Sequence, residues 1–208
     1  MKDDTHTVLI NYLDTLEETP LWELWRTGEI DLDTYANVLI QLHSLHRALE
    51  TALSESDPLG IFGPSLIQSD ILLGDLYVVR QFAHRQPRVH PAVEAMATCS
   101  IPSWNENIPE RIIGVYWFME SLRRRMLSLF GGTVTCLMTL PGNNRGLAYM
   151  RQPLSEYPTV WHRQQRRFEK RLDQSQYAHQ GAVGIIHLGE LLDHVFRSIV
   201  PDLYSTRG

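Results

Sequence analysis

Apolar residues recur at three- and four-residue intervals along most of this chain, the spacing that one face of an α-helix requires. The clearest run follows Asp31, a residue type that favours helix N-caps, and it continues to Leu53. Its apolar face consists of Tyr35, Val38, Leu39, Leu42, Leu45, Leu49 and Leu53. The whole pattern predicts helices over about residues 5–19, 22–26, 32–53, 69–84, 110–130, 159–174 and 178–200.

Proline, glycine and asparagine mark the segments between these helices. Residues 87–109 carry several prolines, which predicts a linker with one or two helical turns at 92–98. Residues 58–64 and 141–158 are predicted to be loops on the same grounds. The best strand candidate is 133–140, which is equally compatible with a helix. The pattern therefore predicts an all-α fold, with residues 1–208 forming a single domain.

Composition narrows the classes of protein to consider. A length of 208 residues is sufficient for one substantial core, and the net charge of −5 gives no reason to expect a nucleic-acid partner. The chain has only two cysteines, which do not make a disulfide framework and suit a reducing compartment; both are predicted to be buried free thiols. The apolar runs at 8–10 and 126–140 are too short for a signal peptide or a membrane span. We therefore expect a soluble cytoplasmic protein without a membrane association.

The segment from residue 20 to residue 53 carries a motif in two parts. Pro-Leu-Trp at 20–22 precedes the long helix, on which Leu45, His46, Leu49, Glu50 and Leu53 follow. This arrangement resembles the beginning of the heme oxygenase superfamily. Residues 71–76 are similar to that family's L-x-x-D-L helix, and 114–116 are similar to the start of its distal helix. The resemblance implies a heme-oxygenase-like multi-helix bundle.

The same resemblance implies where a heme pocket would lie and which of its residues are missing. Leu13 stands where the family has the histidine that binds heme iron, and leucine has no lone pair to donate. Residues 120–125 match the glycine-rich distal segment, but Glu120, Arg124 and Arg125 replace its glycines. The pocket by family position would be lined by Leu9, Leu13, Glu17, Tyr116, Glu120 and Arg124. We therefore expect that ordinary heme-degrading activity is absent.

Two enzymatic alternatives remain open at this point. An active heme oxygenase, which converts heme to biliverdin, iron and CO, would need another axial ligand. Tyr12 and His6 are the nearby choices, although Tyr12 points about 100° away from position 13 on a helix. A heme-oxygenase-like di-iron oxidase would draw on His43, His46, Glu50, Glu120, His187, Glu190 and His194. The order of these residues along the chain differs from the Glu-x-x-His pairs of di-iron bundles. The early helix reads His-x-x-His-x-x-x-Glu instead.

Two runs of basic residues remain to be interpreted. The basic runs at 123–125 and 163–171 are predicted to form solvated helix faces. The preferred interpretation is a divergent, pseudo-enzymatic heme-oxygenase-like protein that binds a small molecule such as a tetrapyrrole, or that acts through a protein partner or as a homodimer.

Overall fold

The computed structural model describes residues 2–58, 60, 67–130, 146–151 and 157–200, and all its regular elements there are helical. The long helices are α1 (Lys2–Glu17), α3 (Leu32–Glu55), α7 (Pro109–Phe130), α9 (Tyr157–Gln174) and α10 (His179–Ile199). The shorter elements are α2 (Pro20–Thr27), α4 (Ser69–Val79), α5 (Pro91–Ala95), α6 (Ile101–Asn107), a π-helical turn at Met96–Ser100 and a 3-10 turn at Tyr149–Arg151. The predicted all-α, multi-helix class is confirmed. The strand candidate at 133–140 and most of the two predicted loops lie outside the described residues.

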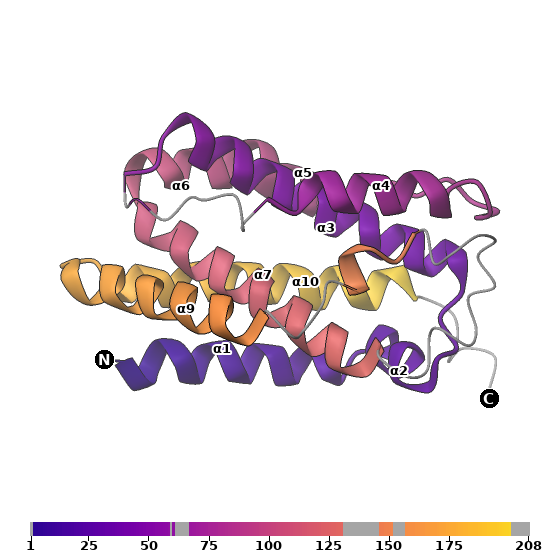
Figure 1. The fold of residues 1–208 in the computed structure, drawn as a ribbon, viewed down its shortest axis with the longest axis horizontal. Coiled ribbons are helices and arrows are strands. Elements are labelled where there is room, and N and C mark those ends of the chain that lie inside the picture. Colours follow the sequence, from indigo (N-terminus) through magenta and orange to yellow (C-terminus); the bar gives the residue numbers. More distant parts are fainter. Residues whose placement is uncertain (1, 59, 61–66, 131–145, 152–156, 201–208) are drawn as a thin grey trace.

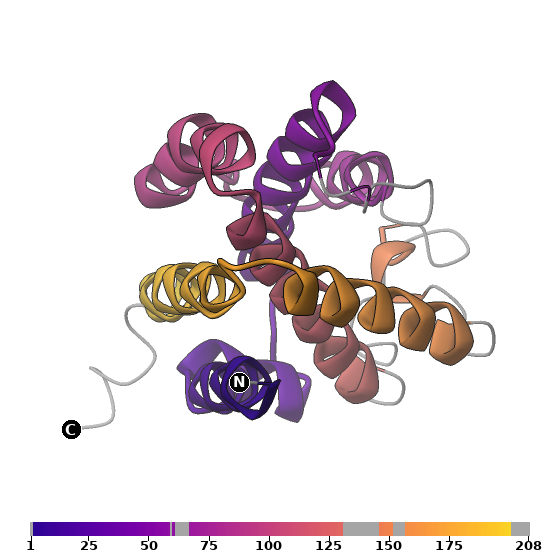
Figure 2. The same cartoon turned by 90° about the vertical axis from the view of Figure 1, so that its left-hand side faces the viewer.

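Helix α7 runs obliquely through the middle of the bundle (Figure 1). The N-terminal helices α1 and α2 lie on one side of it, and the group from α3 to α6 lies on the other (Figures 1 and 2). Helices α9 and α10 flank α7 between these two groups. None of the helices in the described ranges combines the length and the apolar character that crossing a membrane requires.

Local sequence signals explain where the first helices begin and end. Thr19 is the N-cap of α2, with Pro20 in its first turn, and Gly28 closes the helix with φ 74°, a left-handed conformation that favours glycine. Asp31 then caps α3, because its carboxylate accepts a hydrogen bond of 2.7 Å from the N–H of Thr34. The helix start at Asp31 was predicted from the sequence and is confirmed.

The predicted linker at 87–109 is wrong for most of its length, because α5, the π turn and α6 form an almost continuous helix from 91 to 107. Pro91 and Pro102 stand in the first turns of α5 and α6, where the missing N–H of proline costs nothing. The π turn at Met96–Ser100 ends just before Pro102 and lets the helix continue past it. Cys99 lies on this turn and is exposed, contrary to the predicted buried thiol.

Helices α7 and α10 meet at backbone distance. A Cβ added to Gly114 would lie 1.9 Å from the carbonyl oxygen of Gly181, and one on Gly184 would lie 2.2 Å from that of Arg111. Farther along α10, a Cβ on Gly189 would lie 2.5 Å from the ring of Tyr12 on α1. Only glycine fits at these three crossings, so they fix the distances of α10 from both α7 and α1.

We predict that Gly184→Ala lowers the free energy of unfolding by about 1–3 kcal/mol, since the added methyl group meets a main-chain carbonyl that cannot turn aside. Gly74→Ala is the matched control, because a Cβ there meets nothing within 4 Å on α4. Alanine is the better helix former, so this control should gain about 0.4–1 kcal/mol. Urea unfolding followed by circular dichroism measures both changes; equal effects at the two sites would contradict the close crossing.

Candidate functional site

The six pocket residues named by the resemblance lie on two different sides of α7. Leu9, Leu13 and Arg124 line one hollow between α1 and α7, with a volume of about 200 Å³. Tyr116 and Glu120 instead belong to the buried interior, where the Tyr116 ring lies 6.5 Å from that of His46 on α3. The sixth residue, Glu17, is partly exposed and forms an ion pair with Arg125. The structure therefore brings together only half of the predicted pocket.

The hollow beside Leu13 is small. Ligand pockets commonly measure about 300–1,000 Å³, and this one is below that range. Leu13 itself is 2% exposed and belongs to the hydrophobic core. A tetrapyrrole macrocycle therefore has no room at this place in the present arrangement of helices.

Of the two alternative axial ligands, His6 lines this hollow, whereas Tyr12 is directed away from it. The hydroxyl of Tyr12 lies 3.4 Å from the Glu190 carboxylate, to which it donates, and its ring packs against Gly189, so the side chain is directed at α10. Burial and the nearby Glu190 both raise the pKa of Tyr12, which disfavours the phenolate that would bind iron. His6 is exposed in the early part of α1, with its ring 6.4 Å from that of Trp117.

A buried ion pair occupies the other side of α7. Arg123 and Glu120 are fully or almost fully buried, and their charged atoms lie 3.1 Å apart. Arg123 also donates to the Gln68 side-chain oxygen at 3.3 Å, and its guanidinium lies 5.4 Å from the centre of the Tyr149 ring. The prediction of a solvated face for 123–125 is therefore wrong at Arg123. Its position, three residues after Glu120 on the inner face of α7, lets the carboxylate compensate its charge.

His46 completes this buried network. Its Nε2 lies 3.1 Å from the Tyr149 hydroxyl, and its Nδ1 has no hydrogen-bond partner among the described residues. Complete burial, helped by the positive Arg123, lowers the pKa of His46 to about 3, so the ring is neutral. Burial raises the pKa of Glu120, while Arg123 opposes that shift.

The remaining motif residues on α3 and α4 have structural partners. One oxygen of Glu50 accepts hydrogen bonds from the N–H groups of Gln68 at 2.7 Å and Ser69 at 3.0 Å, and the other accepts from the Ser69 hydroxyl. Glu50 thus supplies from α3 the anionic cap that the first turn of α4 needs. Asp75 accepts in the same way from the N–H groups of Ala148 and Tyr149, at 2.8 and 2.7 Å. These acidic residues hold the fold together and are not available as ligands.

The seven metal-ligand candidates do not meet. The ring of His187 lies 5.4 Å from that of Trp104, and the ring of His194 lies 5.4 Å from that of His90. His43 is buried on α3, and burial is the main reason that its pKa is lowered. No group of three or more His, Cys, Asp or Glu side chains in the described part of the chain is arranged to hold a metal ion. The di-iron alternative therefore gains no support from these residues.

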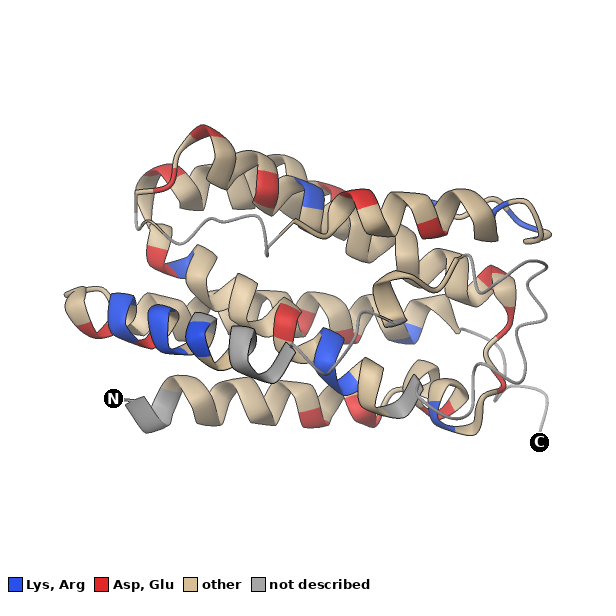
Figure 3. Cartoon of the chain, viewed as in Figure 1, with Lys and Arg blue, Asp and Glu red and all other residues tan. Residues whose placement is uncertain are grey.

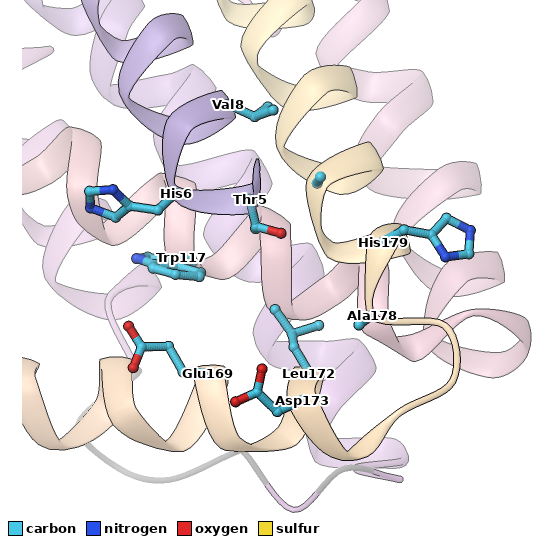
Figure 4. Close-up of a pocket in the computed structure, with 10 residues that line it drawn as sticks. Thr5, His6, Val8, Trp117, Glu169, Leu172, Asp173, Ala178 and His179 are labelled. Carbon is cyan, nitrogen blue, oxygen red and sulfur yellow. The ribbon is translucent and has the colours of Figure 1, made fainter. Parts of the chain in front are cut away.

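A pocket that the sequence did not indicate lies where α1, α7, α9 and α10 come together (Figure 4). Its volume is about 300 Å³. Its walls are formed by Thr5, His6, Val8, Trp117, Glu169, Leu172, Asp173, Ala178, His179 and Ala182. Most of this lining is apolar or aromatic, and the acidic groups come from α9 alone. A mainly apolar hollow with a few polar groups is the usual form of a small-molecule site.

The acidic residues that line this pocket, Glu169 and Asp173, both belong to α9. Figure 4 shows Glu169 and Asp173 extending from α9 toward the side of the pocket that holds His6 and Trp117, while the ring of His179 points away. Glu169 accepts a hydrogen bond of 3.2 Å from the side-chain amide of Gln165. The basic residues of α9 at 163, 166, 167, 170 and 171 are all exposed. Figure 3 shows basic residues following one another along this helix. The predicted solvated basic face is thus confirmed there, and the pocket side of α9 is acidic.

A second hollow, of about 560 Å³, lies between α3, the π turn and α6. It is larger, but its charged residues have both signs, since Arg47, Glu55 and Glu106 all line it. Such a surface does not select the charge of a ligand. The pocket beside Trp117 is therefore the better-defined candidate site.

Removing one member of the buried ion pair should be costly. We predict that Glu120→Ala lowers the free energy of unfolding by about 3–5 kcal/mol, because the Arg123 charge then remains in the core without its carboxylate. The matched control is Glu23→Ala, which breaks a pair of the same spacing, Glu23–Arg26, on the exposed surface of α2. That change should cost about 0–1 kcal/mol. Urea unfolding of both variants tests the difference; similar losses would mean that Arg123 is not buried as described.

The neutral His46 should make stability depend on pH. An unfolded histidine has a pKa of 6.5 and the folded one about 3, so between these values the unfolded chain binds the extra proton. The free energy of unfolding should therefore fall by about 2 kcal/mol from pH 7 to pH 5 through this residue alone. The raised pKa values of Glu120 and Asp75 act in the opposite direction at acidic pH, so the comparison must be between variants.

His46→Gln should remove this part of the pH dependence, whereas His84→Gln, at an exposed position, should keep the parent slope. Urea midpoints measured between pH 7 and pH 5 provide the comparison. Identical slopes in the two variants would show that His46 is charged or accessible in the folded protein.

Comparison with known proteins assigns no family to this chain. No family model and no curated protein matches the sequence. The resemblance to heme oxygenases consequently depends on the quoted motif residues alone, and what the site does must be argued from its own chemistry.

Proposed function

We propose that this chain is a divergent heme-oxygenase-like protein that does not degrade heme and that binds a small organic cation in the pocket between α1, α7, α9 and α10. The observation that carries this proposal is the pocket itself, in which an aromatic residue and two acidic residues line an otherwise mainly apolar hollow. The resemblance supplies only the expected fold and the expected loss of heme chemistry.

The loss of heme chemistry has two supports beyond the sequence. The volume beside Leu13 is only about 200 Å³. The residues on the inner face of α7 are engaged with one another, since Glu120 pairs with Arg123 and Arg123 bonds to Gln68. A porphyrin would have to displace these groups and leave buried charges without partners, which is costly. The proposal therefore excludes tetrapyrroles and keeps the small-molecule ligand of the original hypothesis.

Size sets the first limit on the ligand. A volume of about 300 Å³ is at the lower end of the range for ligand pockets. Since a water molecule takes about 30 Å³ of liquid, the pocket has space for roughly ten heavy atoms. A single aromatic ring with a short side chain is of this size.

Charge and surface chemistry set the second limit. Leu172, Ala178 and Ala182 offer an apolar wall from α9 and α10, and Trp117 adds an aromatic ring from α7. A cation near an indole ring is attracted by its quadrupole, and the two carboxylates of α9 add their own attraction. An amine with an apolar body fits these groups, whereas an anion of the same shape would be repelled.

A titration with three matched probes tests this proposal. Phenethylammonium, 2-phenylethanol and phenylacetate share one ring and a short side chain but differ in charge. Calorimetry should detect binding of the cation and much weaker or no binding of the other two. Hemin added to the same protein should give no retained Soret band after gel filtration. Binding of all three probes with equal affinity, or a retained Soret band, would contradict the proposal.

Substitutions identify the pocket as the place of binding. The double variant Glu169→Gln with Asp173→Asn keeps the shape of the pocket and removes its negative charge, so phenethylammonium should bind about tenfold more weakly. Glu55→Gln is the control, because Glu55 lines the other hollow, between α3 and α6. An equal loss in the control, or none in the double variant, would place binding elsewhere.

A further inference from the structure

Exposed apolar side chains gather along α4 and its flanks. The described part of the chain has five large hydrophobic residues at exposed positions, and four of them lie between residues 67 and 82. Leu73 and Tyr77 stand on the outer face of α4 itself, with 48% and 71% of their surface exposed. Ile67 and Phe82 lie at its two ends. Clusters of this kind on a folded surface usually mark an interaction site.

The inner face of the same helix is firmly held. Leu72, Leu76 and Val79 are buried in the core, and the Glu50 carboxylate caps the first turn of the helix. Helix α4 lies at the outer edge of the bundle beside α3 (Figures 1 and 2). Its outer face is therefore a rigid surface that no other described element covers.

Apolar and charged residues alternate in the same order from both ends of this outer face, with opposite charges at the two ends. From one end it reads apolar, acidic, apolar, and then aromatic, basic, aromatic: Ile67, Asp70, Leu73, Tyr77, Arg80 and Phe82. Asp70 and Arg80 are both exposed, and neither forms an ion pair within the described ranges. Both lie five residues from Asp75, about 7.5 Å along the helix axis at 1.5 Å per residue.

We propose that a second copy of this chain docks on α4. The two α4 helices lie antiparallel across a two-fold axis, which crosses the outer face at the level of position 75 along the helix. In a two-fold interface, if one residue contacts another, the reverse contact also occurs. The arrangement places Asp70 against Arg80 of the other copy, Leu73 against Tyr77, and Ile67 against Phe82, and each contact occurs twice. Every exposed apolar residue of the patch thus meets an apolar one, and both charges are paired.

Two further features favour this occupant. Antiparallel helices place the positive end of each helix dipole beside the negative end of the other. Gly74 lies on the exposed surface next to Leu73, and a Cβ there would meet nothing within 4 Å. Because glycine has no side chain, nothing projects from the helix at this point near the centre of the patch. The two helices can therefore approach each other closely there. The opposite charges of Asp70 and Arg80 are complementary to those of a second copy that lies antiparallel.

The expected association is weak. One short helix and its flanks bury less surface than the 1,200–2,000 Å² or so that is typical of stable complexes. Analytical ultracentrifugation from low micromolar to near-millimolar protein should therefore show a reversible monomer–dimer equilibrium. A monomer throughout this range would overturn the proposal.

Charge reversal tests the register of the contact. Asp70→Arg should weaken the dimer at least about tenfold, because two arginines then face each other at both ends of the interface. Adding Arg80→Asp to this variant should restore dimerisation, since the pairs form again with opposite signs. Failure of the double variant to recover would overturn the antiparallel pairing.

Tyr77→Glu tests the apolar centre. Tyr177→Glu is the control, because Tyr177 is an exposed aromatic residue outside the patch. The first should abolish the dimer and the second should leave it unchanged, with circular dichroism showing that both variants are folded. A dimer that survives Tyr77→Glu would place the interface elsewhere. The pocket beside Trp117 lies on other helices, so ligand binding and dimerisation can fail independently.

Discussion

The rest of the structure depends on the contact between α7 and α10, in which Gly114, Gly181 and Gly184 bring the two backbones together. Because the helices meet without intervening side chains, the axial and rotational position of α7 is determined closely. Tyr116, Glu120 and Arg123 consequently face α3, whereas Trp117, Ser121 and Arg124 face α1 and α9. One crossing therefore decides which residues of the central helix are buried and which can meet a ligand.

The two faces of α7 differ because water reaches only one of them. On the side of α3, Arg123, Glu120 and His46 are buried together, and a low dielectric makes every unpaired charge there costly. On that side Glu120 pairs with Arg123 and His46 bonds to Tyr149, so a large ligand would have to displace paired groups. On the side of α9, the carboxylates at 169 and 173 lie at the wall of an open pocket. The proposed ligand site therefore lies on the side of α7 where the carboxylates border a pocket.

Most of the helices could be predicted from the sequence, because apolar spacing and caps such as Asp31 and Gly28 act within a few residues. The continuous helix at 91–107 was missed, since prolines in first turns look the same in sequence as prolines that end helices. Arg123 was assigned to the surface because it stands in a run of three arginines, and only its tertiary contacts show otherwise. The pocket also escaped prediction: its walls come from four helices distant in sequence, and no local spacing unites Thr5, Trp117 and Asp173.

The residues that carry the resemblance to heme oxygenases support the helices and do not form the new pocket. Glu50 caps α4, Asp75 holds the turn at 148–149, and His46 bonds to Tyr149. Such hydrogen bonds stabilise the fold whether or not a cofactor is bound, since each satisfies a buried main-chain or hydroxyl group. Leu13, by contrast, belongs to the hydrophobic core, and Glu120 and Arg123 pair with each other in the interior. Function is decided by the residues of a site and not by the fold, so the function of this chain must be sought at the pocket that its own residues form.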